Sequence, residues 1–200
     1  MKTLVCEKPG EWIWRQEEIP QVAPGEVLVK IKRVGICGTD LHAFQGNQAF
    51  FEYPRVLGHE LSGVIEDAGD SELNVGQPVL VIPYLHCGTC LACRRGSTNC
   101  CANMRVIGVH QDGGMREYLN VPASHVLPAD DVDFDSMALV ECLAIGAHAV
   151  RRGAVSEGDN VVVVGAGPIG LGCVQFAKAN GANVIVVDMN EDRLAFCEKE

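Results

Sequence analysis

The sequence predicts a mixed β and α/β fold, in which a β-rich segment precedes the start of a parallel α/β sheet. Short β-type stretches separated by glycine and proline turns continue to about residue 130. An amphipathic helical pattern then covers 135–152, and two uncharged apolar runs follow at 161–164 and 183–187. We therefore expect one domain over residues 1–150 and the first part of another over residues 151–200.

The β-rich segment shows the alternation of half-buried strands. Val27, Val29 and Ile31 fall on one face of an expected strand over 27–34, and lysines fall on the other face. Further short strands are expected at 61–66, 79–82 and 117–121. Many short strands joined by turns are typical of a sandwich or a distorted barrel.

The α/β segment follows a strand, turn, helix and strand order. A helix is expected from Pro168 to Asn180 between the two apolar runs, and Asn190 is expected to cap another helix. Two parallel strands with one complete helix make an incomplete sheet, so we expect these residues to be part of a longer protein.

Composition excludes several classes of protein. The 200 residues include 26 acidic and 16 basic side chains, for a net charge of -10, which argues against nucleic acid and anionic membrane as partners. The first 30 residues carry many charges and no apolar core, so no signal peptide is expected. The ten cysteines are then expected to be reduced thiols of a cytoplasmic protein.

Four cysteines follow the spacing C-x2-C-x2-C-x7-C: Cys87, Cys90, Cys93 and Cys101. Short loops that gather four thiolates predict a closed, structural zinc site. The alternatives are disulfides and a nucleic-acid-binding zinc ribbon, which the acidic charge opposes. Cys100 could replace its neighbour as the fourth ligand.

A second constellation combines Cys37, His59 and Glu60 with Glu141, a carboxylate in an apolar helix. One thiolate, one imidazole and one or two carboxylates would make an open zinc site, with a position left for water or substrate. Each residue alone has an ordinary structural explanation, such as a buried cysteine or a hydrogen-bonded histidine.

A glycine-rich turn joins the first apolar strand to its helix. It comprises Gly165, Gly167, Pro168, Ile169 and Gly170, and Asp188 ends the next strand 18 residues after the last glycine. This order predicts a dinucleotide site, with the pyrophosphate at the helix N-terminus. A carboxylate at the adenosine ribose would repel a 2′-phosphate, which favours NAD over NADP.

Taken together, these motifs resemble the zinc-dependent medium-chain alcohol/polyol dehydrogenase family, and within it the sorbitol, threonine and sugar-acid branch. The matching segments are 37–42, 58–60, the cysteine-rich loop, 112–118 and 165–170. The resemblance implies a GroES-like catalytic domain and the first part of a Rossmann NAD-binding domain. It also implies two zinc ions per chain, an NAD cofactor, a small-molecule alcohol substrate and a homo-oligomer, dimer or tetramer.

The resemblance further implies roles for single residues. Cys37, His59 and Glu60 would bind the catalytic zinc, and Glu141 would bind the zinc or hold its water. Asp40 would orient His59. Thr39 would take the alcohol proton and pass it through the cofactor ribose to His42. The rivals are a zinc-free quinone reductase, which would lack the metal ligands, and a non-catalytic zinc-stabilised interaction module, should the protein end at residue 200.

Overall fold

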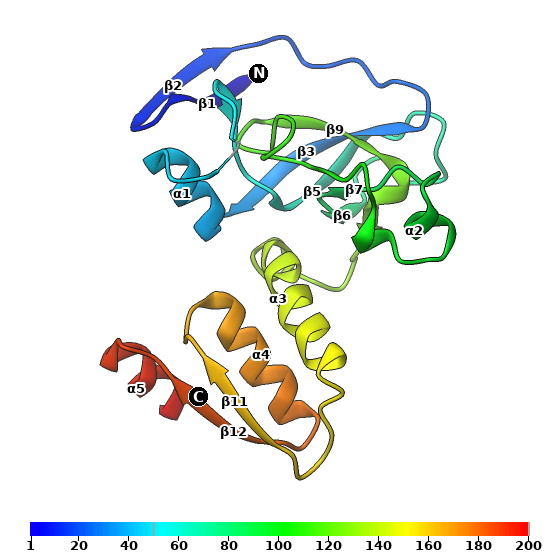
Figure 1. Cartoon of the computed structure of the whole chain (residues 1–200). Helices are drawn as coiled ribbons and strands as arrows, with labels where there is room; N and C mark the ends of the chain where they lie inside the picture. The colour runs from blue at the N-terminus through cyan, green and yellow to red at the C-terminus, as the bar shows by residue number, and fades with distance from the viewer. Residues whose placement is uncertain (50, 200) are drawn as a thin grey trace. The chain divides into compact units, whose positions relative to one another are not determined.

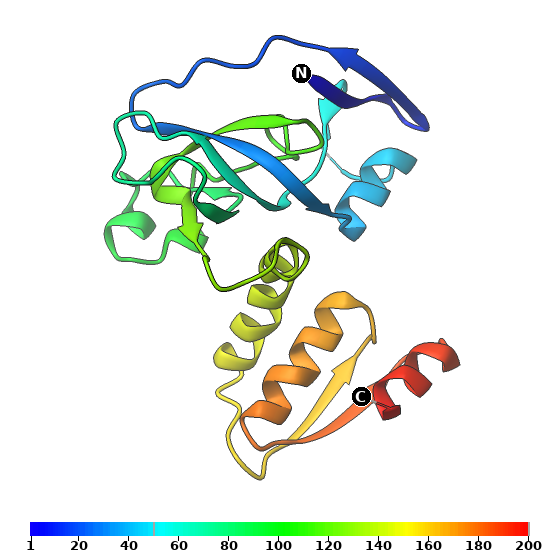
Figure 2. The same cartoon turned by 180° about the vertical axis from the view of Figure 1, so that it is seen from behind.

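The computed structural model describes residues 1–49 and 51–199 (Figures 1 and 2). The chain divides into two compact units, Met1–Ala138 and Leu139–Glu200, which are described separately. The division falls inside helix α3 (Phe134–Arg152), earlier than the expected domain boundary at residue 150. The reason is that the later part of this helix packs within the second unit, as described below.

The first unit is built around a five-stranded antiparallel sheet in the order β10-β6-β5-β3-β9 (Figure 1). Val27 and Val29 are fully buried in its core, as their alternation predicts, and Leu61 and Ile65 pack with them. Each such side chain stabilises the fold by about 1.5–3 kcal/mol. The strands are β3 (Glu26–Gly35), β5 (Glu60–Asp67), β6 (Pro78–Val81), β9 (Tyr118–Pro122) and β10 (Val126–Pro128).

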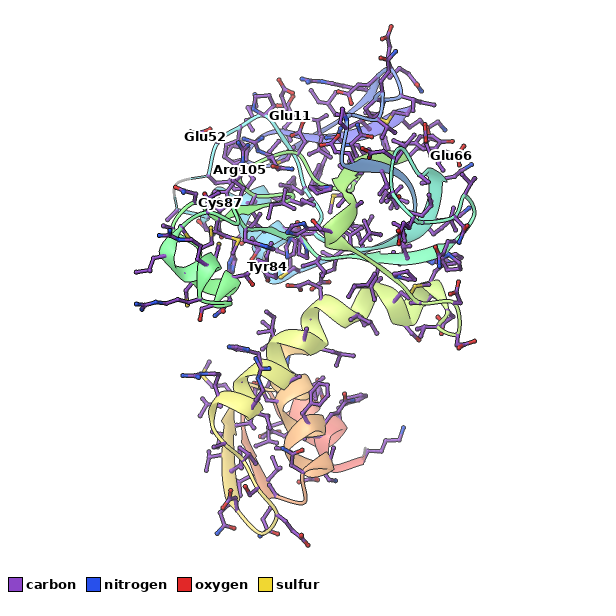
Figure 3. The ribbon with its side chains drawn as sticks, turned by 90° about the vertical axis from the view of Figure 1, so that its right-hand side faces the viewer. Glu11, Glu52, Glu66, Tyr84, Cys87 and Arg105 are labelled. Carbon is purple, nitrogen blue, oxygen red and sulfur yellow. The ribbon has the colours of Figure 1, made fainter. Side chains whose placement is uncertain are left out.

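Two smaller sheets were not expected from the sequence. Strands β1 (Lys2–Lys8) and β2 (Glu11–Gln16) form a hairpin, and β4 (Arg55–Val56) pairs with the other edge of β1. Strand β7 (Tyr84–Leu85) pairs with β8 (Arg105–Val106), so the two ends of the cysteine-rich segment are held together. Figure 3 labels Tyr84 and Arg105 at these two ends and Cys87 in the segment between them.

Short helices lie between the strands of the first unit. Helix α1 (Gly38–Gln45) begins two residues after β3 ends, and α2 (Leu91–Arg94) lies in the cysteine-rich segment. Two 3₁₀ turns span Thr98–Cys100 and Ala123–His125. Helix α1 was not expected from the sequence, since it is short and only weakly amphipathic.

The second unit has the expected strand, helix and strand order. Strands β11 (Asn160–Val164) and β12 (Asn183–Val187) are parallel and are joined by α4 (Pro168–Ala179). Helix α5 (Glu191–Lys199) begins after Asn190, whose side chain accepts the Arg193 N–H at 3.2 Å, which confirms the predicted cap.

Helices α3 and α4 approach each other closely through glycine. A Cβ atom on Gly146 would lie 2.7 Å from the carbonyl carbon of Gly172, so α3 could not carry a larger residue at position 146 without moving away from α4. The mixed β and α/β fold class is confirmed. No helix within the described residues is long and apolar enough to cross a membrane.

Candidate functional site

The first unit brings three of the predicted metal ligands together. Cys37 precedes the first turn of α1, His59 immediately precedes β5, and Glu60 begins that strand. Their ligand atoms lie within 4.8 Å of one another, and His59 and Glu60 are buried. A thiolate, an imidazole and a carboxylate fit a zinc ion and leave its fourth position open, as catalytic sites do.

The surroundings of Cys37 favour the thiolate that metal binding needs. Hydrogen bonding to the His59 side chain is the largest influence, and it lowers the pKa of the Cys37 thiol. Burial opposes this effect, while hydrogen bonds from the backbone and hydroxyl of Thr39 add to it. The thiolate is the form of cysteine that binds metal ions, and a lowered pKa makes this form more abundant.

Asp40 connects the two ligand-bearing segments. Its carboxylate is buried and accepts the Cys37 N–H at 2.9 Å and the Gly58 N–H at 3.1 Å. The Nδ1 atom of His59 lies 3.9 Å from the same carboxylate. Asp40 therefore holds both chain segments in place and lies near the imidazole, and its orienting role toward His59 stays a prediction.

Close backbone contacts with Gly113 and Gly114 also hold the segment that contains His59. Gly113 donates to the Val56 carbonyl at 2.7 Å, and Gly114 donates to the Gly58 carbonyl at 2.9 Å. A Cβ on Gly113 would lie 2.4 Å from the Gly58 carbonyl oxygen. The two glycines lie in the matching segment 112–118, but their role could not be predicted because the contact depends on tertiary structure.

The two residues of the predicted proton relay both lie on α1. Thr39 is half-buried beside Cys37, and His42 is exposed. Their three-residue separation places them on neighbouring positions of one helix face. Glu141 lies on α3 in the second unit, where it is half-buried next to the buried Cys142.

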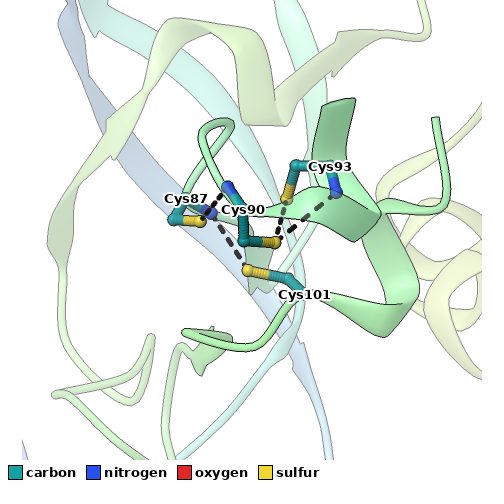
Figure 4. A group of neighbouring side chains, drawn as sticks. All are labelled: Cys87, Cys90, Cys93 and Cys101. Atoms are coloured by element: carbon teal, nitrogen blue, oxygen red, sulfur yellow. Dashed lines mark hydrogen bonds between the residues drawn. The ribbon is translucent and has the colours of Figure 1, made fainter. Parts of the chain in front are cut away.

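The four spaced cysteines form a second group (Figure 4). The sulfur atoms of Cys87, Cys90, Cys93 and Cys101 lie within 4.8 Å of one another. Cys101 belongs to this group, while Cys100 is exposed and forms the end of the 3₁₀ turn. Backbone N–H groups point at the sulfur atoms, for example from Cys87 to Cys101 at 3.3 Å and from Cys90 to Cys87 at 3.4 Å.

The pKa values of these thiols differ widely. Hydrogen bonding from the Thr89 hydroxyl, followed by backbone N–H groups, lowers the pKa of Cys87 to about 5. Desolvation, followed by its sulfur neighbours, raises the pKa of Cys93 to about 12. Without a cation the cluster therefore keeps protons that a metal ion would displace. Four thiols at this spacing fit a closed tetrahedral zinc site.

The glycine-rich turn lies in the second unit, between β11 and α4. Gly165 has a positive φ of 100°, and a Cβ on Gly170 would lie 1.8 Å from the Gly165 carbonyl oxygen, so only glycine fits there. Pro168 opens α4, where a missing N–H costs nothing, and Ile169 follows as an exposed residue. A Cβ on Gly165 or Gly167 would meet nothing within 4 Å, which leaves the backbone open to a ligand.

Asp188 follows β12 and closes this turn. Its carboxylate accepts the Ala166 N–H at 2.6 Å and the Asn190 N–H at 2.8 Å. The Ala166 hydrogen bond is the largest of the influences that lower the pKa of Asp188. The carboxylate is therefore an anion at neutral pH, next to the turn that would hold a pyrophosphate.

Comparison with known proteins defines the class. Residues 23–131, more than half of the chain, match the alcohol dehydrogenase GroES-like domain, and the chain belongs to this family. The predicted zinc-dependent medium-chain dehydrogenase relationship is confirmed.

Two similar proteins are named as dehydrogenases of L-galactonate and of galactitol 1-phosphate. The chain is 56% identical to L-galactonate-5-dehydrogenase of Escherichia coli K12 over 96% of its own length and 57% of that protein. It is 36% identical to the crystal structure of galactitol-1-phosphate dehydrogenase from Escherichia coli, with a TM-score of 0.94 over 100% of the chain and 59% of that protein.

A third relative was solved with a nucleotide. The short chain alcohol dehydrogenase rspB from Escherichia coli CFT073, in complex with NADH, is 40% identical, with a TM-score of 0.93 over 100% of this chain and 60% of that one. The chain thus spans about three fifths of the length of these relatives.

Proposed function

We propose that the whole protein oxidises a secondary alcohol of a polyol or a sugar acid similar to L-galactonate and transfers the hydride to NAD. The observation that carries this proposal is the group of half-buried Cys37 and buried His59 and Glu60, whose ligand atoms lie within 4.8 Å of one another. The relatives named for L-galactonate and galactitol 1-phosphate support the substrate class.

A zinc ion at this group would act as a Lewis acid that stabilises the alkoxide form of the alcohol. Cys37, His59 and Glu60 would hold the ion, and Asp40 would keep the two ligand segments at their spacing. The Thr39 hydroxyl would take the alcohol proton, and the exposed His42 would release it to solvent. Glu141 would supply a further carboxylate, either to the metal or to its water.

NAD would bind through the backbone of the glycine-rich turn. The N-terminal end of α4 carries a partial positive charge that suits a pyrophosphate. The anionic Asp188 would accept hydrogen bonds from a ribose and repel a 2′-phosphate, so NAD is expected over NADP.

The four-cysteine cluster would hold a second zinc ion that fixes the loop between β7 and β8. We also propose a cytoplasmic protein that forms a dimer or a tetramer, with no nucleic acid or membrane as a partner. Two zinc ions per chain would fit the enzyme, and one would fit a zinc-stabilised interaction module.

The test is NADH formation by the full-length protein with neutral polyols, threonine and aldonates, L-galactonate included. Selective oxidation of aldonates is the expected result. Selective turnover of sorbitol or threonine would keep the mechanism and replace the substrate. Cys37→Ala should abolish turnover while NAD binding survives, and an active Cys37→Ala variant would refute the zinc site.

A further inference from the structure

We propose that Gly35 is a positioning residue for the group of Cys37, His59 and Glu60, because the space beside its Cα atom is what admits the Glu60 carboxylate. The inference concerns the metal site on which the proposed function rests, and it does not depend on the substrate.

Gly35 and Glu60 are direct partners across the antiparallel pair of β3 and β5. A Cβ atom on Gly35 would lie 2.2 Å from the Glu60 Oε2 atom, 2.8 Å from its Cβ and 3.2 Å from its Cδ. Cross-strand Cβ atoms usually lie about 4.5–5.5 Å apart, so the close approach here requires a residue without a side chain. The buried Glu60 carboxylate occupies the space thus left open.

The requirement for glycine at position 35 is steric. Gly35 does not have the left-handed backbone conformation that other residues avoid, whereas Gly58 in the same site has a φ of 92°. An alanine could therefore adopt the backbone conformation of Gly35, and the displaced atoms would be those of Glu60. This separates the position from the glycines that make turns.

The Gly35–Glu60 pair lies where both ligand-bearing segments leave the sheet. Cys37 follows Gly35 by two residues, and His59 directly precedes Glu60. A side chain at position 35 would push the Glu60 carboxylate away from its present place and strain the neighbouring peptide of His59. Gly35 thus acts on the metal through Glu60.

The experiment titrates Co²⁺ into the full-length protein while the four-cysteine cluster retains zinc, and it follows the visible absorption of the bound metal. Gly35→Ala should weaken Co²⁺ binding by about 10–100-fold, as expected for a residue that orients a ligand, and should change the spectrum as Glu60→Gly does. In the Glu60→Gly background, Gly35→Ala should have no further effect, because the atoms that it would displace are gone.

The matched control is Gly38→Ala, since a Cβ on this nearby glycine would meet nothing within 4 Å. It should bind Co²⁺ as the unaltered protein does. Zinc retained at the cysteine cluster shows that a variant is folded. If the single variant Gly35→Ala loses this zinc, the double variant with Glu60→Gly should retain it.

Three results would overturn the inference: wild-type Co²⁺ binding by Gly35→Ala, weaker binding by the double variant than by Glu60→Gly, or a double variant that loses the cluster zinc. Hydride transfer is not the readout. An inactive full-length protein with the expected Co²⁺ pattern would refute the proposed function and still support the role of Gly35.

Discussion

Replacement of Asp40 tests whether one carboxylate holds the two ligand segments together. Its two oxygens accept N–H groups from Cys37 and Gly58, and its side chain is only 3% exposed. In Asp40→Ala both N–H groups lose their acceptor, and each buried unpaired donor costs about 1–3 kcal/mol. The Cys37 N–H is partly solvated, so its cost is smaller. The free energy of unfolding should therefore fall by about 2–4 kcal/mol. Asp40→Asn keeps one acceptor oxygen, so about half of this loss is expected.

Urea unfolding of the metal-free protein measures these free energies without a contribution from the metal. Asp131→Ala removes an exposed carboxylate and should stay within about 0.5 kcal/mol of the unaltered protein. Equal free energies of unfolding for Asp40→Ala and Asp131→Ala would refute the role of Asp40 in holding the two segments. A metal titration of the folded variants should then show a loss of about 10–100-fold in affinity for Asp40→Ala.

Three other predictions concern the cysteine cluster and the glycine-rich turn. Metal analysis should find one zinc fewer in Cys101→Ser and no loss in Cys100→Ser; equal loss would make either cysteine a ligand. Gly170→Ala would place a Cβ 1.8 Å from the Gly165 carbonyl oxygen, so calorimetry should detect at least tenfold weaker NADH binding, and unchanged binding would exclude this turn. Backbone N–H donors hold the pKa of Asp188 below its ordinary 3.8, so its stabilising contribution is complete above that pH and is lost as the pH falls through the lower, folded value. The free energy of unfolding of Asp188→Asn should therefore depend less on pH in this acid range. A pH dependence identical to that of the unaltered protein would contradict the stabilising role of the Asp188 carboxylate.

The sequence predicted the second unit well, because local signals determine its elements. Strand β12 (Asn183–Val187) has the predicted bounds, and α4 (Pro168–Ala179) differs by one residue at its end. Uncharged β-branched runs and glycine or proline at the boundaries carry this information without tertiary context. The hairpin of β1 and β2 was missed, because each strand has an apolar run of only three residues between charged ends.

The candidate site shows the same division between local and tertiary information. Spacing indicated the four cysteines, yet the choice between Cys100 and Cys101 depended on the 3₁₀ turn that ends between them. The family resemblance implies Glu60 as a ligand, but the sequence alone does not show the register of β3 and β5 that brings Glu60 close to Cys37. Gly35 gave no signal, because the demand for space at that position comes from the opposite strand.

The close spacing of the four cysteines also bears on how the protein tolerates oxidants. The Sγ atoms of Cys90 and Cys93 are 3.4 Å apart, and a disulfide requires about 2.05 Å, so a small movement would join them. A bound metal ion shields thiolates from this reaction by occupying their lone pairs. Chelation followed by exposure to air would therefore leave the loop cross-linked by a disulfide. Zinc alone would not restore the metal-binding loop, whereas a thiol reductant added before the metal would.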